Sequence, residues 1–170
     1  MKVFLTGKPR SGKSTVLARV INILKNKGLK VGGFITPEIV VNGKRVGFKV
    51  IDVYSGEEGI LAKVCTGVED KPRVGKYCVD VEDFERVVLP ALDFAVNECD
   101  VVCVDEIGKM ELFSKKFKEK IEEILRSEKT VVAVLHRNLV GRYGKYGKVV
   151  YVTVENRGRL AEEVITILES

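Results

Sequence analysis

Apolar runs and amphipathic segments alternate along most of this chain. Continuous apolar runs predict strands that are buried on both faces, as in a parallel sheet. These runs lie at residues 3–6, 101–104 and 131–135. Apolar positions at helical spacing predict helices over residues 16–24, 81–97, 117–125 and 157–168. With further strands expected at 30–36 and 149–154, the alternation favours an α/β fold, a three-layer α/β/α sandwich with a mostly parallel central sheet.

A β-rich block at residues 34–79 interrupts this alternation. Asn42-Gly43 separates two β-rich runs, and an Asn-Gly pair in that setting is the strongest short-range signal for a hairpin. Beyond the hairpin we expect a turn at 54–59 and short strands at 60–64 and 77–79. The hairpin makes the predicted sheet mixed, with antiparallel strands at one edge.

Two helix starts carry residues that favour capping. Asp80 precedes the helix predicted at 81–97, and Ser114 precedes the one at 117–125. Pro90 falls inside the first of these helices. Because proline lacks a backbone N–H and clashes with the preceding turn, we expect it to kink or divide that helix.

Length and charge narrow the class of protein. A chain of 170 residues suits one domain, so we expect residues 1–170 to form a single domain. Lys and Arg number 29 against 24 Asp and Glu, and the net charge of +5 suits binding of nucleotide phosphates. The basic residues are dispersed, so we do not expect a nucleic-acid site. Without a long apolar run or a signal peptide, we expect a cytoplasmic monomer with no membrane partner.

The cysteines do not predict a metal site. Cys65, Cys78, Cys99 and Cys103 form no C-x-x-C pair, and no cysteine is near the single histidine, His136. Cys103 lies in an apolar run and Cys99 just before it. We therefore expect these two to be buried free thiols in a reducing compartment.

Residues 7–15 read G-K-P-R-S-G-K-S-T and fill the pattern G-x-x-x-x-G-K-[ST] between an apolar run and a helical run. Backbone N–H groups of such a loop and the N-terminal end of the helix bind phosphate. We expect nucleoside triphosphate binding here, with Lys13 bridging β- and γ-phosphates and Ser14 holding Mg²⁺. This makes the sandwich a P-loop NTPase fold. The predicted phosphate-binding residues are Gly7, Lys8, Pro9, Arg10, Ser11, Gly12, Lys13, Ser14 and Thr15.

Two acidic residues, Asp105 and Glu106, directly follow the apolar run 101–104. A carboxylate at the tip of a strand beside the P-loop faces the Mg²⁺ ion in enzymes of this kind, and we assign this metal-facing place to Asp105. We expect Glu106, one residue further out, to polarise a water for attack on the γ-phosphate.

Phosphate transfer also needs cations beyond Lys13. Our first choice is Arg137, because it follows the apolar run 131–135 at the tip of a predicted strand, where the ligand crevice of an open α/β sheet lies. The other candidates are Arg10, Lys109, His136 and Arg142.

The run V-D-E-I-G-K-M-E-L-F at residues 104–113 resembles the signature of a family of small thermophile nucleoside-triphosphatases, called cancer-related NTPases in vertebrates. The segments 6–15, 32–38, 45–48, 74–77 and 155–157 also fit that family. Ser14 stands where threonine is frequent in the family, and both offer the hydroxyl that Mg²⁺ needs. The loop 137–147 matches no pattern of the family, so the cations proposed there rest on position alone.

The resemblance implies slow Mg²⁺-dependent hydrolysis of nucleoside triphosphates such as ATP and GTP to diphosphate and phosphate, with little base selectivity. It also implies nucleotide binding around the acidic strand. The residues concerned here are Val101, Val102, Cys103, Val104, Asp105, Glu106, Ile107 and Gly108.

Two other functions remain open from the sequence. A small-molecule or nucleoside kinase would use the same nucleotide site, with the block 34–79 forming an acceptor pocket, because water and a substrate hydroxyl need the same geometry. The second open function is that of a switch or binding module operated by a nucleotide. The segment Asn26-Lys27-Gly28-Leu29 lacks the aspartate of the guanine-reading motif N-K-x-D, so guanine specificity has no visible source.

Overall fold

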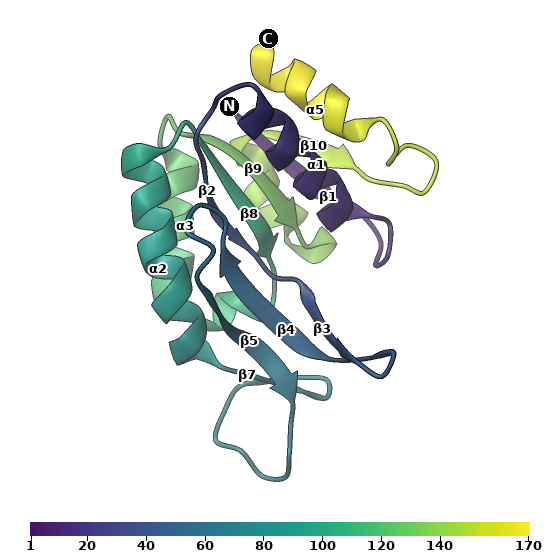
Figure 1. Cartoon of the computed structure of the whole chain (residues 1–170), viewed down its shortest axis with the longest axis vertical. Helices are drawn as coiled ribbons and strands as arrows, with labels where there is room; N and C mark the ends of the chain where they lie inside the picture. The colour runs from purple at the N-terminus through teal and green to yellow at the C-terminus, as the bar shows by residue number, and fades with distance from the viewer.

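The computed structural model describes residues 1–170 as a ten-stranded sheet flanked by helices (Figure 1). The strands are β1 (Lys2–Thr6), β2 (Val31–Ile35), β3 (Glu38–Val41), β4 (Lys44–Asp52), β5 (Glu58–Val64), β6 (Arg73–Val74), β7 (Tyr77–Val79), β8 (Val101–Ile107), β9 (Thr130–Leu135) and β10 (Lys148–Tyr151). The helices are α1 (Lys13–Asn26), α2 (Val81–Glu98), α3 (Lys115–Arg126), α4 (Val140–Tyr143) and α5 (Leu160–Glu169). Single 3₁₀ turns lie at η1 (Glu111–Phe113), η2 (Arg137–Leu139) and η3 (Gly144–Tyr146).

The sheet has two halves that differ in strand direction. Five strands pair in parallel in the order β10-β1-β9-β8-β2, and we call them the parallel half. From β2 the sheet continues antiparallel through β4, β5, β7 and β6, with β3 paired to β4; this second part, residues 38–79, is called the β extension. The predicted mixed sheet is confirmed.

The predicted hairpin joins β3 to β4. Asn42 and Gly43 both have positive φ, 50° and 76°, as a two-residue hairpin turn that matches strand twist requires. The short strand β6 was not predicted, because two residues carry no readable alternation.

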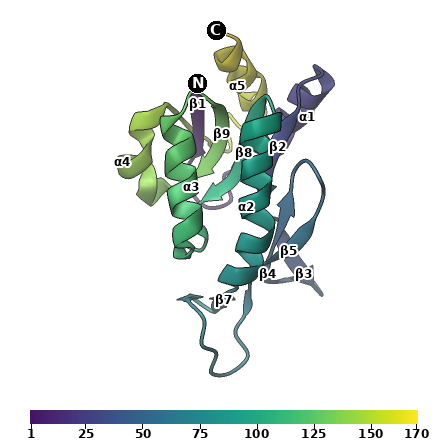
Figure 2. The ribbon, with the colours of Figure 1, turned by 90° about the vertical axis from the view of Figure 1, so that its left-hand side faces the viewer.

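Helices cover both faces of the parallel half, α1 and α5 on one face and α2 and α3 on the other (Figures 1 and 2). Alternate residues of β8 serve the two layers: Val102 and Val104 pack with α2 and α3, whereas Cys103 packs with α1 and α5. This is why the strand is apolar at every position from Val101 to Val104, before the acidic pair near its end. The three-layer sandwich predicted from the sequence is confirmed.

Both predicted helix caps are present. The Asp80 carboxylate accepts from the backbone N–H of Asp83 at 3.0 Å, and Ser114 Oγ accepts from that of Phe117 at 3.0 Å. We expected Pro90 to kink or divide its helix, and of these two effects the division is wrong, since α2 continues unbroken from Val81 to Glu98. Its apolar face is buried along the whole length, and this burial outweighs the one lost hydrogen bond.

Cys99 and Cys103 are buried free thiols, as predicted. The other two cysteines form a disulfide, Cys65–Cys78, which the sequence reasoning missed. It joins the end of β5 to β7 across a loop, and nothing in the spacing of the cysteines indicates that pairing. No helix in the structure has both the length and the apolar character that a bilayer span requires.

Candidate active site

The loop between β1 and α1 has the shape of an anion cradle. Gly7 has φ 148°, and a Cβ there would lie 2.6 Å from the Val152 carbonyl oxygen, so only glycine fits. Gly12 caps α1 with φ 104°, and no acidic residue occupies the first turn of that helix. The N–H groups at the start of α1 are therefore free to face an anion.

Lys13 lies folded over this loop. Its Nζ donates to the carbonyl oxygens of Gly7 at 2.8 Å and Lys8 at 3.2 Å. The carbonyl oxygens of the loop therefore hold the ammonium group. The neighbouring Ser11 hydroxyl is buried and has no hydrogen-bond partner in the chain.

The acidic pair lies at the end of β8. Asp105 is 7% exposed, and burial is the main cause that raises its pKa to about 6, with the Ser14 hydroxyl acting in the opposite direction. Its backbone is fixed by Thr36, whose hydroxyl donates to the Asp105 carbonyl oxygen at 2.8 Å. The buried carboxylate has no salt bridge, and it faces the cradle beside Ser14.

Glu106 lies at an irregularity of the sheet. Pairing between β8 and β9 shifts between Asp105 and Ile107, which leaves Glu106 as the extra residue. Burial raises the pKa of the Glu106 carboxyl, and the charge of Lys13 partly opposes the shift. Consecutive acids therefore extend into the same cleft instead of pointing to opposite faces of the strand.

Glu111 is a site residue that the sequence reasoning did not single out. It is only 3% exposed, and burial followed by repulsion from Glu106 raises the pKa of its carboxyl well above the ordinary value. A Cβ on Gly108 would lie 2.9 Å from Glu106 Oε1 and 3.0 Å from Glu111 Oε1. Gly108 thus lies close to both carboxyl groups. The only sequence signal for Glu111 was its position in the run 104–113.

These elements meet in one cleft of about 1000 Å³, lined by residues at the ends of β8 and β9 and by the loop 7–15 except for Lys8 and Ser11. Asp105 and Glu106 are the only residues of the predicted segment 101–108 among those that line it. Val101, Val102, Cys103 and Val104 are at most 4% exposed inside the sheet and position the acids without reaching the cleft.

Most of the predicted cations lie in the cleft. Its lining includes Arg10, Lys109, His136 and Arg137. Burial, Lys13 and Arg137 lower the pKa of His136, in that order, which favours its neutral form. Arg142 lies elsewhere, 3.5 Å from Glu122.

Arg157 also lines the cleft and was missed as a cation. Its Cδ would lie 2.8 Å from a Cβ on Gly12, so this arginine packs directly against the cradle. The Asn156 side chain holds the preceding loop by accepting from the Thr153 N–H at 2.8 Å and donating to the Tyr151 carbonyl at 2.9 Å. These bonds hold the turn that follows β10 and precedes Arg157.

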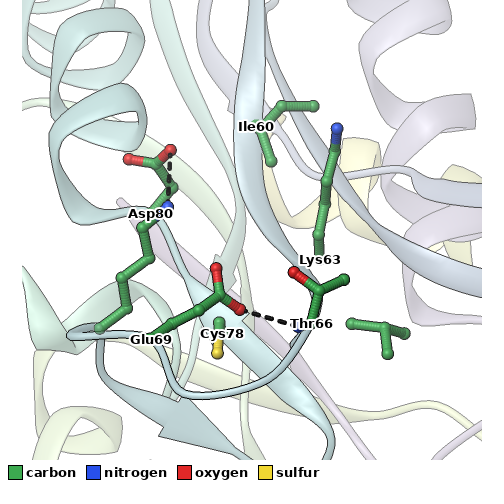
Figure 3. Close-up of a pocket in the computed structure, with 8 residues that line it drawn as sticks. Ile60, Lys63, Thr66, Glu69, Cys78 and Asp80 are labelled. Carbon is green, nitrogen blue, oxygen red and sulfur yellow. Dashed lines mark hydrogen bonds and ion pairs between the residues drawn. The ribbon is translucent and has the colours of Figure 1, made fainter.

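A second pocket, of about 260 Å³, lies outside this cleft at the far end of the β extension (Figure 3). It shares no lining residue with the cleft and borders the disulfide residue Cys78. Two of its acids are engaged locally: Glu69 accepts from the Thr66 N–H at 3.0 Å, and Asp80 lies 3.7 Å from Lys71. These contacts hold the loop between β5 and β6.

Comparison with known proteins agrees with the site. A family model described as NTPase matches residues 2–165. Nucleoside-triphosphatase THEP1 of Methanocaldococcus jannaschii is 44% identical over 165 residues, which cover 97% of this chain and 95% of the relative. The protein of the same name from Pyrococcus abyssi is 42% identical over 165 residues, covering 97% and 90%.

Solved structures give the same result. The crystal structure of THEP1 from the hyperthermophile Aquifex aeolicus superposes with a TM-score of 0.84 at 33% identity and covers 100% of both chains. The solution structure of a human cancer-related nucleoside triphosphatase gives 0.82 at 35% identity, covering 98% of this chain and 96% of that one. The chain therefore belongs to the NTPase family of nucleoside-triphosphatases.

Proposed function

We propose that this protein hydrolyses nucleoside 5′-triphosphates to diphosphate and phosphate, with Mg²⁺ as cofactor and little selectivity for the base. The observation that carries the proposal is that Lys13 on its cradle and the acids Asp105 and Glu106 line one cleft. The family membership and the names of the relatives support the same activity. Low base selectivity fits a chain without the N-K-x-D motif.

Asp105 and Ser14 are the residues that would hold Mg²⁺. A hydroxyl and a carboxylate are oxygen ligands of the kind that Mg²⁺ prefers, and the buried Asp105 carboxyl has no salt bridge within the chain. Bound there, the ion would supply positive charge to the β- and γ-phosphate oxygens.

The chain's own residues divide the remaining work. The cradle N–H groups and Lys13 bind the phosphates, and Lys13 balances charge that develops on the transferred group. Glu106 orients the attacking water and accepts its proton, since a carboxyl with a raised pKa is a stronger base near neutral pH. Arg137, which follows β9 and lines the same cleft, stabilises the transition-state charge.

A single copy of the chain supplies all these groups, so we propose that residues 1–170 act as one domain and as a monomer. We place the activity in the cytoplasm, where nucleoside triphosphates are available. The dispersed basic residues give no footprint for nucleic acid, and we propose none as a partner.

The test is Glu106→Gln, with the exposed Glu119→Gln as the matched control. We expect phosphate release by Glu106→Gln to fall about 100-fold or more while the dissociation constant for the triphosphate stays within a few-fold, because only the base is removed. Glu119→Gln should match the wild type. A wild-type rate in Glu106→Gln would move the base elsewhere, and lost affinity would make Glu106 a binding residue.

A further inference from the structure

The cleft continues past Glu106 to a wall formed mainly by the β extension. This wall consists of Thr36, Glu38, Arg45, Phe48, Leu61 and Val74. The full volume, about 1000 Å³, is at the upper end of the roughly 300–1000 Å³ found for small-molecule pockets. The nucleotide cradle lies at the other end, so this wall has no part in the hydrolysis described above.

The order of strands fixes which end of the triphosphate faces this wall. From the P-loop strand β1 the sheet runs through β9 to β8, where Glu106 lies, and then through β2 to β4 and β5. A triphosphate bound with its γ-phosphate at Glu106 would therefore point this phosphate toward the β extension. Arg157 and the loop after β10 lie on the opposite side of the cradle, so its sugar and base would leave the phosphates on that side.

The side chain of Arg45 in this wall is held by hydrogen bonds and by cation–π contacts. Its Nε donates to the Tyr77 hydroxyl at 2.9 Å, and its guanidinium carbon lies 5.1 Å from the Phe48 ring centroid and 5.6 Å from that of Tyr77. Nη1 donates to Glu38 at 3.3 Å, and Nη2 has no hydrogen-bond partner in the chain. The guanidinium is thus held by two rings and offers a free edge to an anion.

The surroundings of Arg45 give the rest of the ligand's chemistry. Phe48, Leu61 and Val74 supply apolar surface, and Met110 closes the same space from the end of β8. Lys109 adds a second positive charge beside Glu106. A short apolar body carrying one carboxylate or phosphate group matches this lining, with a hydroxyl free to face Glu106.

We propose that this half of the cleft binds a hydroxyl-bearing small anion and that the protein transfers the γ-phosphoryl group of the triphosphate to it. The inference rests on the triphosphate site of the proposed function. In the step, the acceptor hydroxyl oxygen forms a bond to the γ-phosphorus and its proton passes to Glu106. The bond from the γ-phosphorus to the β,γ-bridging oxygen breaks, and its electron pair leaves with the nucleoside diphosphate. Hydrolysis is the same step with water in the acceptor's place.

The experiment measures diphosphate and free phosphate separately with ATP, Mg²⁺ and one probe at a time. The carboxylate arm uses 4-hydroxybutyrate and glycerate, and the phosphate arm uses 4-hydroxybutyl phosphate and glycerol 3-phosphate. The uncharged controls are 1,4-butanediol and glycerol. We expect diphosphate to exceed free phosphate in one charged arm, the difference being recovered as phosphorylated probe, and no excess with the diols.

Two arginine variants of the β extension separate recognition from folding. Arg45→Gln should reduce transfer to the charged probe about 10- to 100-fold, the effect of one lost charge-assisted hydrogen bond. Arg73→Gln is the matched control, because Arg73 is exposed, bonds only the Gly75 carbonyl oxygen and does not line the cleft; its transfer should equal that of the wild type.

Equal amounts of diphosphate and free phosphate with every probe would overturn the proposal. So would transfer that is as fast to the diols, or that Arg45→Gln leaves unchanged. The failure of the proposed function looks different: phosphate release without any probe would then persist in Lys13→Ala. Release that depends on Lys13 but never yields phosphorylated probe would remove the acceptor site alone.

Discussion

The parallel half of the sheet and the β extension line the same cleft, but they are built differently. Strands β1, β8 and β9 are buried almost along their whole length, whereas β3 and β6 are largely exposed. Helices cover both faces of the parallel half, and the extension depends instead on strand pairing, the packing of its inner face on α2 and a disulfide (Figure 2). The groups to which we assign a chemical task come from β8 of the parallel half, which carries Asp105 and Glu106, and from the start of α1, which carries Lys13.

The difference in burial between the two regions matches the two functions that we propose for them, phosphate chemistry and recognition of a second ligand. Phosphate chemistry needs groups held within a fraction of an ångström, and buried parallel strands supply that rigidity. Recognition of a varying second ligand tolerates an exposed wall such as the one around Arg45. Changes in the two regions should therefore have effects of different kind and size.

The largest effect is expected from Lys13→Ala in the cradle. Turnover of triphosphate should fall at least about 1000-fold, because the transferred phosphoryl group loses the cation that balances its developing charge. The measurement is phosphate release under saturating triphosphate, with the folded state checked by circular dichroism. Lys44→Ala, an exposed change in the β extension, should leave the rate unchanged; equal losses in both variants would erase the distinction between the regions.

A core substitution probes the stability side of the comparison. Phe34 of β2 is fully buried and packs edge-to-face on Phe84 and Phe117, each at 5.6 Å between ring centroids. Phe34→Ala should lower the free energy of unfolding by about 3–5 kcal/mol, measured by denaturant titration. Val41→Ala in β3, where the side chain is 52% exposed, should change it by less than about 0.5 kcal/mol. If Val41→Ala lowered the free energy of unfolding as much as Phe34→Ala does, the β extension would have a core of its own.

Removal of the disulfide in the β extension should lower stability by less than Phe34→Ala does. It closes a loop with a sequence separation of 13 residues, so Cys65→Ser with Cys78→Ser should lower the free energy of unfolding by about 2–3 kcal/mol through a less restricted unfolded chain. Hydrolysis without an acceptor should persist in the folded variant. If the hydrolysis rate fell when the disulfide is removed, hydrolysis would depend on the structure of the β extension, which would contradict the comparison.

The smallest effect is a change of stability with pH in the metal-free protein. The Asp105 pKa rises from an ordinary 3.8 to about 6 in the folded state, so the folded protein binds this proton more tightly than the unfolded chain. The resulting contribution to stability is present below about pH 4 and is lost as the pH rises through about 6. Urea unfolding with EDTA at pH 5 and pH 7 should show a smaller loss in Asp105→Asn than in the wild type; a larger loss in the variant would contradict this sign.

Local signals allowed much of this molecule to be predicted. The P-loop pattern, the Asn42-Gly43 turn, the caps Asp80 and Ser114 and the acids after β8 each depend on neighbours in sequence. The missed features depend on contacts between distant segments: Arg157 meets Gly12, Arg45 meets Tyr77, and Cys65 meets Cys78. Glu111 was missed because an acid at the start of a short 3₁₀ turn has the pattern of a solvated residue, and only the tertiary fold buries it.

The most direct test of this account is a crystal structure with a non-hydrolysable triphosphate and Mg²⁺. We predict the γ-phosphate between Lys13 and Glu106, the metal ion on Ser14 and Asp105, the base on the Arg157 side, and the space beside Arg45 and Phe48 left free by the nucleotide. A base stacked on Phe48, or phosphates outside the cradle, would contradict the division of the cleft between the two halves of the sheet.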